Sequence, residues 1–275
     1  MELNDITVYI TVRNEEERIE ACLKRLLWAK EIIIFDKEST DKTVMICREL
    51  GANVISVPNY TVNNKGAERF KHNGSGNWCL FLTASDLLGA KLKDDILKII
   101  NKKNDTTYAI ALPFLAFIFG TPIKMSPFSG NSKVLLIKRD KVLISNTVHQ
   151  EIGFNGDKFL KIKSPKIDDL EAHVVHLSNE TVLDYMNKFP RYMEMELHSN
   201  KNSSFFKNIK LLIKSIIIAL IYKPSYIYGR RGLTVTSAYL SYVFARFAIQ
   251  LDKSCNKKYV SAAEIYEKIR NNEQD

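Results

Sequence analysis

The stretch that decides the fold is Glu31-Ile32-Ile33-Ile34-Phe35-Asp36-Lys37-Glu38-Ser39-Thr40-Asp41-Lys42-Thr43. Consecutive β-branched residues ahead of a polar turn predict a buried parallel strand. Ser39 or Thr40 is the expected N-cap of the helix that follows, with Asp41 in its first turn. Asp36 is then at the carboxyl end of the strand, where open α/β sheets bind ligands. The alternative is that Asp36 is only a turn or capping residue.

The N-terminal sixty or so residues repeat this pattern, and together they predict β-α-β-α-β. A strand is expected at residues 6–12, and another at residues 53–57. Between them, Asn14 is the expected N-cap of a helix, and Glu17 occupies the capping-box position. Apolar residues then recur at one-face helical spacing at Ile19, Cys22, Leu23, Leu26 and Leu27. This order indicates a parallel sheet with right-handed crossovers. No Gly-x-Gly-x-x-Gly follows the first strand, which argues against a dinucleotide site.

Two motifs carry a resemblance. Thr11-Val12-Arg13-Asn14-Glu15-Glu16 follows the first strand, and Asp36 with Ser39-Thr40-Asp41-Lys42-Thr43 follows the second. Together they resemble the opening of family 2 glycosyltransferases of the GT-A fold, and most closely the bacterial lipopolysaccharide-core β-glucosyltransferase type. Further matches, in order along the chain, are residues 76–82, Val148-His149, His176-Leu177-Ser178, Asp184-Tyr185, Lys188, Arg191-Tyr192 and residues 229–232.

The resemblance implies a fold and an activity. The fold is α/β and Rossmann-like: a mostly parallel sheet flanked by helices over residues 1–200, with a C-terminal helical extension over residues 201–275. The activity is inverting transfer of a hexose from a nucleotide sugar, expected to be UDP-linked. The acceptor is a saccharide, lipid-linked or part of lipopolysaccharide or another cell-surface glycan. The runner-up is a catalytically weak or inactive member of the family that binds nucleotide or glycan at the membrane.

The resemblance also implies a nucleotide site. The positions expected to contact the nucleotide sugar from the first two loops are Thr11, Arg13, Asn14, Glu15 and Asp36. Lys65 and Arg69, on a helix before the fourth strand, are candidate phosphate or nucleotide contacts, although they also fit a solvated helix face.

The expected diphosphate site departs from the family. Relatives carry Asp-Ala-Asp-Glu after the fourth strand, where the acidic pair holds Mg²⁺ or Mn²⁺ against the phosphates. This chain has Thr83-Ala84-Ser85-Asp86. Asp86, with His176 after a strand at residues 172–175, is the expected metal site, and Ser85 is a candidate donor contact. The alternatives are that Lys and Arg side chains neutralise the phosphates without metal, that the chain binds without catalysing, and that His176 is a core or capping residue.

The catalytic base is also altered. Relatives read Val-His-Glu, whereas this chain reads Val148-His149-Gln150-Glu151. An amide cannot accept a proton. Successive strand residues point to opposite faces, so Glu151 needs a one-residue bulge to replace Gln150. His149 is the other candidate base, and Glu151 also fits a solvated surface charge.

Composition agrees with a globular cytoplasmic protein. The chain has 275 residues, with 45% hydrophobic and 26% charged, which excludes a disordered chain. Its four cysteines show no metal-binding spacing and indicate reduced thiols. The N-terminus leads directly into a strand with no signal peptide, so a cytoplasmic location is expected.

The net charge of +9 indicates an anionic partner, and the alternative is a merely solvated basic surface. No nucleic-acid recognition motif is present, so nucleic acid is not expected. Residues 201–231 combine Lys and Arg with apolar residues and contain no acidic residue. The apolar run is too short to cross a bilayer, so we expect an in-plane helix on the anionic inner face of the cytoplasmic membrane. Residues 238–251 carry Tyr239, Tyr242, Phe244 and Phe247, which suit a membrane interface. The alternative for both segments is packing on the catalytic domain.

Overall fold

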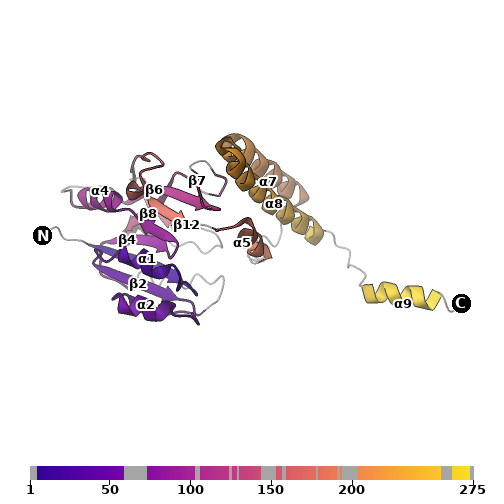
Figure 1. Cartoon of the computed structure of the whole chain (residues 1–275), viewed down its shortest axis with the longest axis horizontal. Helices are drawn as coiled ribbons and strands as arrows, with labels where there is room; N and C mark the ends of the chain where they lie inside the picture. Colours follow the sequence, from indigo (N-terminus) through magenta and orange to yellow (C-terminus); the bar gives the residue numbers. More distant parts are fainter. Residues whose placement is uncertain are drawn as a thin grey trace.

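The computed structural model describes residues 5–58, 73–102, 106–123, 126–128, 130–143, 153–156, 159–177, 179–190, 193, 204–254 and 262–272. An α/β domain built on one large sheet is followed by a helical region (Figure 1). The strands of the large sheet are β1 (Ile6–Val12), β2 (Glu31–Asp36), β3 (Asn53–Ser56), β4 (Trp78–Thr83), β5 (Asp86–Leu88), β6 (Ala109–Ile118), β7 (Thr121–Ile123), β8 (Ser132–Lys138), β11 (Phe159–Lys161) and β12 (Val174–Leu177).

The sheet has a parallel half and a mixed half. Its main strand order is β3-β2-β1-β4-β8-β6-β12-β5, and β7 and β11 also pair with β6. The first four strands of that order are parallel to one another, as predicted. β8 runs antiparallel to β4 and β6, and β12 is parallel to β6 but antiparallel to β5. A separate two-stranded sheet joins β9 (Val142–Leu143) to β10 (Gly153–Phe154). The predicted α/β fold class is confirmed.

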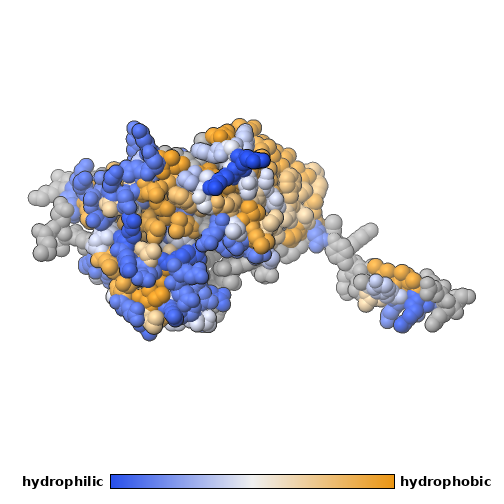
Figure 2. All heavy atoms as spheres, viewed as in Figure 1, coloured by the Kyte–Doolittle hydropathy of each residue, from blue (hydrophilic) through white to orange (hydrophobic). Residues whose placement is uncertain are grey.

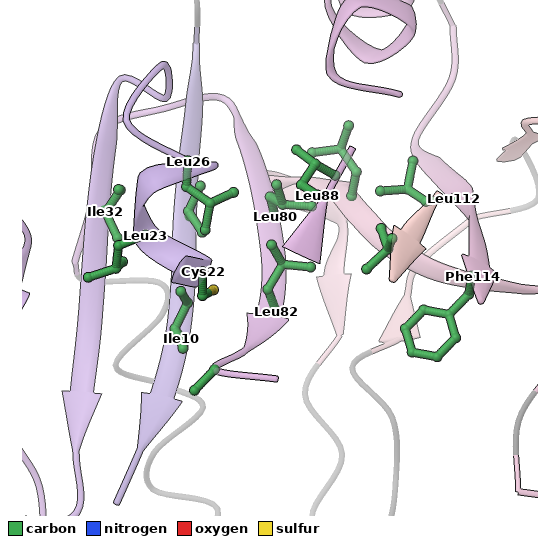
Figure 3. Packing of buried hydrophobic residues seen from close by; sticks show 14 of the residues in the cluster. Ile10, Cys22, Leu23, Leu26, Ile32, Leu80, Leu82, Leu88, Leu112 and Phe114 are labelled. Carbon is green, nitrogen blue, oxygen red and sulfur yellow. The ribbon is translucent and has the colours of Figure 1, made fainter. Parts of the chain in front are cut away.

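The main hydrophobic core lies between one face of the sheet and the helices α1 (Ile19–Lys24), α2 (Thr43–Glu49) and α4 (Ala90–Ile100). Figure 3 shows Cys22, Leu23 and Leu26 against strand residues such as Ile10. Leu27, predicted to belong to this face, is 53% exposed, because α1 ends at Lys24 and the helical spacing no longer applies. Burial of the remaining residues fixes α1 on the parallel half of the sheet.

The predicted helix caps are wrong. α1 begins at Ile19 with Arg18 as its N-cap and no side-chain cap bond, so Asn14 and Glu17 form no capping box. α2 begins at Thr43 with Lys42 as its N-cap, so neither Ser39 nor Thr40 caps it. Asn14 and Ser39 instead form hydrogen bonds between the two loops. Tertiary hydrogen bonding therefore replaces the local caps that the sequence suggested.

Several short segments link the sheet to the helical region. His176 lies within β12 and not after a strand, because the predicted strand at residues 172–175 begins two residues later, at Val174. The 3₁₀ turn η2 (Leu170–Ala172) occupies the earlier positions, and η1 (Arg139–Lys141) follows β8. The helical elements after β12 are α5 (Val182–Asn187), α7 (Phe205–Ile217), the π-helical turn η3 (Ile218–Tyr222), the 3₁₀ turn η4 (Ser225–Tyr228), α8 (Gly229–Ser254) and α9 (Ala262–Asn272).

Helices α7 and α8 lie side by side, and α9 lies apart from the other elements (Figure 1). An aromatic cluster joins α8 to the α/β domain. Phe128 contacts Tyr239 with ring centroids 5.4 Å apart, and Phe189 contacts Tyr242 at 5.2 Å. Tyr239 and Tyr242, expected to suit a membrane interface, therefore pack on the domain. Among the described residues, no helix is both long and apolar enough to cross a membrane.

Candidate active site

The candidate site lies where the parallel strands end. The register pairs Val12 of β1 with Asp36 of β2, and Thr11 of β1 with Thr83 of β4. Parallel strands in register bring their carboxyl ends to one edge of the sheet. The residues that the sequence placed in separate motifs therefore meet at this edge.

The loops after β1 and β2 are joined to each other by side-chain-to-backbone hydrogen bonds. We call residues 13–18 and 37–42 the paired loops. Asn14 and Glu38 both adopt left-handed backbone conformations, with φ of 53° and 55°. The bonds run from Asn14 N to Ser39 Oγ (2.9 Å), from Thr40 N to Asn14 Oδ1 (2.8 Å), from Glu15 N to Thr43 Oγ1 (2.7 Å), from Glu16 N to Asp41 Oδ2 (3.1 Å) and from Lys42 N to Glu16 Oε2 (2.9 Å).

Several residues that were predicted to contact the nucleotide sugar form hydrogen bonds or ion pairs within the protein. The Asn14 side chain accepts a hydrogen bond from the neighbouring loop and is already engaged there. Glu15 forms an ion pair with Arg18 at 2.7 Å. Burial acts to raise the pKa of the Asp41 carboxyl, but hydrogen bonds from Thr43 and from the Glu16 backbone outweigh it and hold that pKa below its usual range. The paired loops are thus preorganised before any ligand binds.

Asp36 closes the turn after β2. Asp36 is 5% exposed as a residue, and both of its carboxylate oxygens accept from Ser39 N at 3.2 Å. A carboxylate has about four lone-pair positions, so these bonds leave acceptor capacity. Both readings of Asp36, as a turn residue and as a ligand contact, are compatible with this geometry. Arg13 and Thr11 are exposed beside it.

A cavity of about 300 Å³ opens at this edge. Thr11, Thr83, Asp86 and His176 are among the residues that line it. Aromatic rings form its apolar wall, with Tyr9 stacked on Phe81 at 5.4 Å between centroids. The full lining is Tyr9, Thr11, Phe81, Leu82, Thr83, Asp86, Phe114, Lys133, Val134, Leu135 and His176.

Asp86 and His176, the predicted metal ligands, are brought together by strand pairing. β5 and β12 place them opposite each other, and Asp86 Oδ1 is hydrogen-bonded to His176 Nδ1 at 2.8 Å. The other oxygen, Oδ2, accepts from Thr83 N at 2.7 Å and from Thr83 Oγ1 at 2.9 Å. Asp86 is only 3% exposed. The carboxylate is therefore bonded through both of its oxygens to the protein itself.

These residues do not fit a preformed divalent-cation site. Hard cations such as Mg²⁺ and Mn²⁺ need several oxygen ligands. Within the part of the chain that the structure describes, no group of three His, Cys, Asp or Glu side chains could hold a metal ion. The hydroxyl of Thr83 donates its hydrogen bond to Asp86, and Ser85 is not among the residues that line the cavity.

The remaining sequence-based site residues stay predictions. His149, Glu151, Lys65 and Arg69 lie outside the described residues. Sequence reasoning missed Lys133, together with the rings of Tyr9, Phe81 and Phe114. No motif surrounds Lys133. The available signal was its place at the polar start of an otherwise apolar strand.

Comparisons with known proteins agree with this geometry. The family model "Glycosyl transferase family 2" matches residues 7–156. An uncharacterized glycosyltransferase of Rickettsia typhi is 26% identical, over 96% of this chain and 92% of the relative. One from Rickettsia prowazekii is 24% identical over the same shares. Among solved structures, glucosyl-3-phosphoglycerate synthase from Mycobacterium tuberculosis, in complex with Mn²⁺, UDP and glucosyl-3-phosphoglycerate, is 16% identical over 72% of this chain and 81% of that chain. Its TM-score is 0.43, a likeness too distant to indicate a substrate.

Proposed function

The chain belongs to glycosyl transferase family 2, and we propose that it moves a hexose from a UDP-linked sugar to a saccharide acceptor with inversion of configuration. The observation that carries this proposal is the convergence of Thr11, Asp36, Asp86 and His176 at one sheet edge, beside a cavity of about 300 Å³. Apolar clefts with a few convergent polar groups are typical ligand sites.

The donor half of the site suits a nucleotide sugar. Asp36 retains acceptor capacity for a ring N–H of the base, and the paired loops hold the backbone around it. The rings of Tyr9, Phe81 and Phe114 offer an apolar wall for the base or the sugar. These features support a nucleoside diphosphate sugar, and the uracil base is our specific choice.

The reaction needs a proton acceptor and neutralisation of the leaving group. The acceptor oxygen forms a bond to the anomeric carbon as the bond to the diphosphate breaks, and the acceptor proton passes to a base. We assign the base to His149 or Glu151, as the sequence predicts. Asp86 accepts from Thr83 and is bonded to His176, so its role supported by geometry is to orient the imidazole. We assign no step to Mg²⁺ or Mn²⁺, because the described residues form no preformed site for either ion.

The helical region supports a lipid-linked acceptor. Exposed apolar side chains gather on α7, η3, η4 and α8, where Figure 2 shows a large orange area. Basic residues such as Lys207, Lys210 and Lys214 lie on the same helix α7. Basic and apolar surface together favour in-plane binding to anionic lipid. The exposed apolar residues are Phe205, Phe206, Leu211, Ile213, Ile217, Leu220, Ile221, Tyr222, Tyr226, Ile227, Tyr228, Leu233 and Phe244.

We therefore propose that residues 1–200 form the catalytic domain and that residues 201–275 form an extension. The extension would hold the catalytic domain on the inner face of the cytoplasmic membrane. There the acceptor would be a lipid-linked saccharide of lipopolysaccharide or another cell-surface glycan, as in the lipopolysaccharide-core β-glucosyltransferase type. The second candidate function is binding without efficient catalysis, which is favoured by the hydroxyl side chains of Thr83 and Ser85 in place of carboxylates.

A thermal-shift panel tests the donor class. UDP-, GDP-, dTDP- and CMP-sugars are compared with and without Mn²⁺, because a ligand that binds the folded state raises Tm by mass action. We expect the largest shift with a UDP-sugar. A larger shift with another nucleotide would contradict the UDP assignment. Incubating the preferred donor with bacterial glycolipid and measuring released UDP then separates catalysis from binding alone.

Liposome flotation tests the membrane proposal. Phe206→Ser combined with Ile221→Ser and Tyr222→Ser should reduce flotation with anionic vesicles. The matched control is Leu27→Ser with Met45→Ser, which removes exposed apolar side chains from the catalytic domain. Binding should also weaken in high salt and with neutral lipid. Equal flotation of wild type and the triple variant would remove α7 and η3 from the membrane contact.

A further inference from the structure

We propose that Lys133 binds the donor's diphosphate and supplies the positive charge that a divalent cation provides elsewhere, so that donor binding at this site is independent of metal. The inference rests on the proposed function, since it names the group that recognises the phosphates of the nucleotide sugar. Lys133 becomes a binding residue of the donor site, facing the leaving group.

The first step is the position of Lys133. It lies near the start of β8, which is inserted between β4 and β6, and it pairs in register with Leu112 of β6. Its side chain lines the same cavity as Thr11, Thr83 and His176. Lys133 is the one Lys or Arg among the described residues that line this cavity. A cationic side chain is thus built into the site at the edge where the parallel strands end.

The second step is the environment of its ammonium group. Lys133 Nζ lies 4.0 Å from the centroid of the Phe114 ring, and that ring lies 5.4 Å from the His176 ring. Along the described parts of the chain, no carboxylate forms an ion pair with Lys133. A cation–π contact is weaker than a charge-assisted hydrogen bond to phosphate. The ammonium can therefore leave the ring for a phosphate oxygen without breaking a stronger interaction.

The third step is the lack of negative charge that would hold a metal. Thr83 and Ser85 are neutral, and Asp86 is bonded through both oxygens to Thr83 and His176. A departing diphosphate still needs its developing charge neutralised. With few carboxylates to attract a dication and an ammonium already present, the site is electrostatically suited to an anion. Asp86 and Thr83 then serve to fix the β4–β5 turn and the imidazole of His176.

The experiment measures the affinity of the full-length protein for UDP and UMP by calorimetry, in EDTA and in Mn²⁺. The variants are Lys133→Gln, which removes the charge, and Lys133→Arg, which keeps it. Lys161→Gln is the matched control, because Lys161 is exposed on β11 outside the cavity lining. Loss of a charged hydrogen bond to phosphate should weaken UDP binding by at least about tenfold in Lys133→Gln. UMP binding should fall less, and Lys133→Arg and Lys161→Gln should stay near wild type.

Two results would overturn the inference: wild-type UDP binding that is lost in EDTA, and equal UDP affinity of Lys133→Gln and wild type. Thermal unfolding verifies that each variant is folded. If Lys133→Gln is unstable, Lys133→Met removes the same charge but keeps an unbranched side chain against Phe114, and the EDTA arm on wild type tests the metal dependence by itself. Failure of the proposed function looks different, because wild type would then bind no UDP under either condition.

Discussion

The two ends of the candidate donor site are built in opposite ways. At one end, the paired loops at residues 13–18 and 37–42 bond to each other through side chains that reach backbone amides across the gap. At the other end, the hydrogen bonds lie within the β4–β5 turn at residues 83–86. There, Asp86 accepts from the backbone amide and from the hydroxyl of Thr83. Carboxylate and amide groups therefore fix the backbone at the first end. At the second end, the one carboxylate, Asp86, accepts hydrogen bonds within the turn.

This contrast shows which carboxylates hold the backbone of the fold. Asp36 and Asp41 in the paired region accept backbone hydrogen bonds that the fold requires. Thr83 and Ser85 carry hydroxyls, and the β4–β5 turn is held by the hydrogen bonds from Thr83 to Asp86. The carboxylates of Asp36 and Asp41 therefore hold backbone amides, whereas the carboxylate of Asp86 is held by the hydroxyl and the amide of Thr83.

The largest effect is expected for Asp36→Ala, at the paired-loop end. The substitution removes the acceptor for Ser39 N and the proposed contact to the base, so nucleotide binding should be lost. A charged hydrogen-bond partner contributes about 1.5–3 kcal/mol, and unfolding free energy should fall by a similar amount. Calorimetry with UDP and urea unfolding measure both. Asp36→Asn is the control because it keeps an acceptor for Ser39. Unchanged UDP affinity in Asp36→Ala would leave Asp36 with the turn role alone.

The next effect concerns the β4–β5 turn. Thr83→Asp with Ser85→Asp restores the acidic motif but replaces the hydroxyl that donates to buried Asp86. Without metal, we expect a loss of about 1–3 kcal/mol in stability, because buried Asp86 loses the hydroxyl of its hydrogen-bond donors and gains like charge nearby. Mn²⁺ should raise the Tm of this variant much more than that of wild type. Tight Mn²⁺ binding by wild type would show that the segment was matched to the acidic motif incorrectly.

A smaller effect, with a pH signature, is expected for Asp41→Asn. The pKa of Asp41 is lowered in the folded protein by its hydrogen bonds to Thr43 and Glu16, so its charged form stabilises the fold. This contribution is present above the unfolded pKa of about 3.9 and is lost as pH falls through the lower folded pKa. The difference in unfolding free energy between wild type and variant should therefore shrink between about pH 5 and pH 2. A difference that stays constant over this pH range would contradict the assignment of stabilising hydrogen bonds to Asp41.

The smallest effect is expected for Glu38→Gly in the paired loops. Glu38 is exposed with a φ of 55°, a conformation that costs a non-glycine residue about 1 kcal/mol. Glycine removes this strain but adds entropy to the unfolded chain, so we expect a gain of about 0.5 kcal/mol. Glu49→Gly, in α2, should instead lose about 0.5–1 kcal/mol. A loss at both positions would contradict the assignment of strain at Glu38.

Sequence patterns were sufficient for the parallel half of the sheet. The run at Ile6–Val12 forms a strand with the predicted bounds, and the run that begins at Glu31 forms a strand that ends at Asp36, because buried β-branched runs have few alternatives. The predictions of the helix caps were wrong for a physical reason. Asn14 and Ser39 can hydrogen-bond to an amide of the following helix or to a neighbouring loop, and the spacing of residues in the sequence does not indicate which partner is nearer in the folded protein. The tertiary contact between the paired loops determined that Asn14 and Ser39 bond across the loops and do not cap the helices.

The sequence by itself determined the family, the order of strands and helices in the first half, and the candidate acidic and imidazole residues Asp86 and His176. Only the tertiary structure decided how these residues are used. The bond between Asp86 and His176 arises from antiparallel pairing of β5 with β12, and the cation in the cavity arises from the insertion of β8 between β4 and β6. Both depend on pairing between segments far apart in the chain. Local periodicity carries no information about which distant strands will meet.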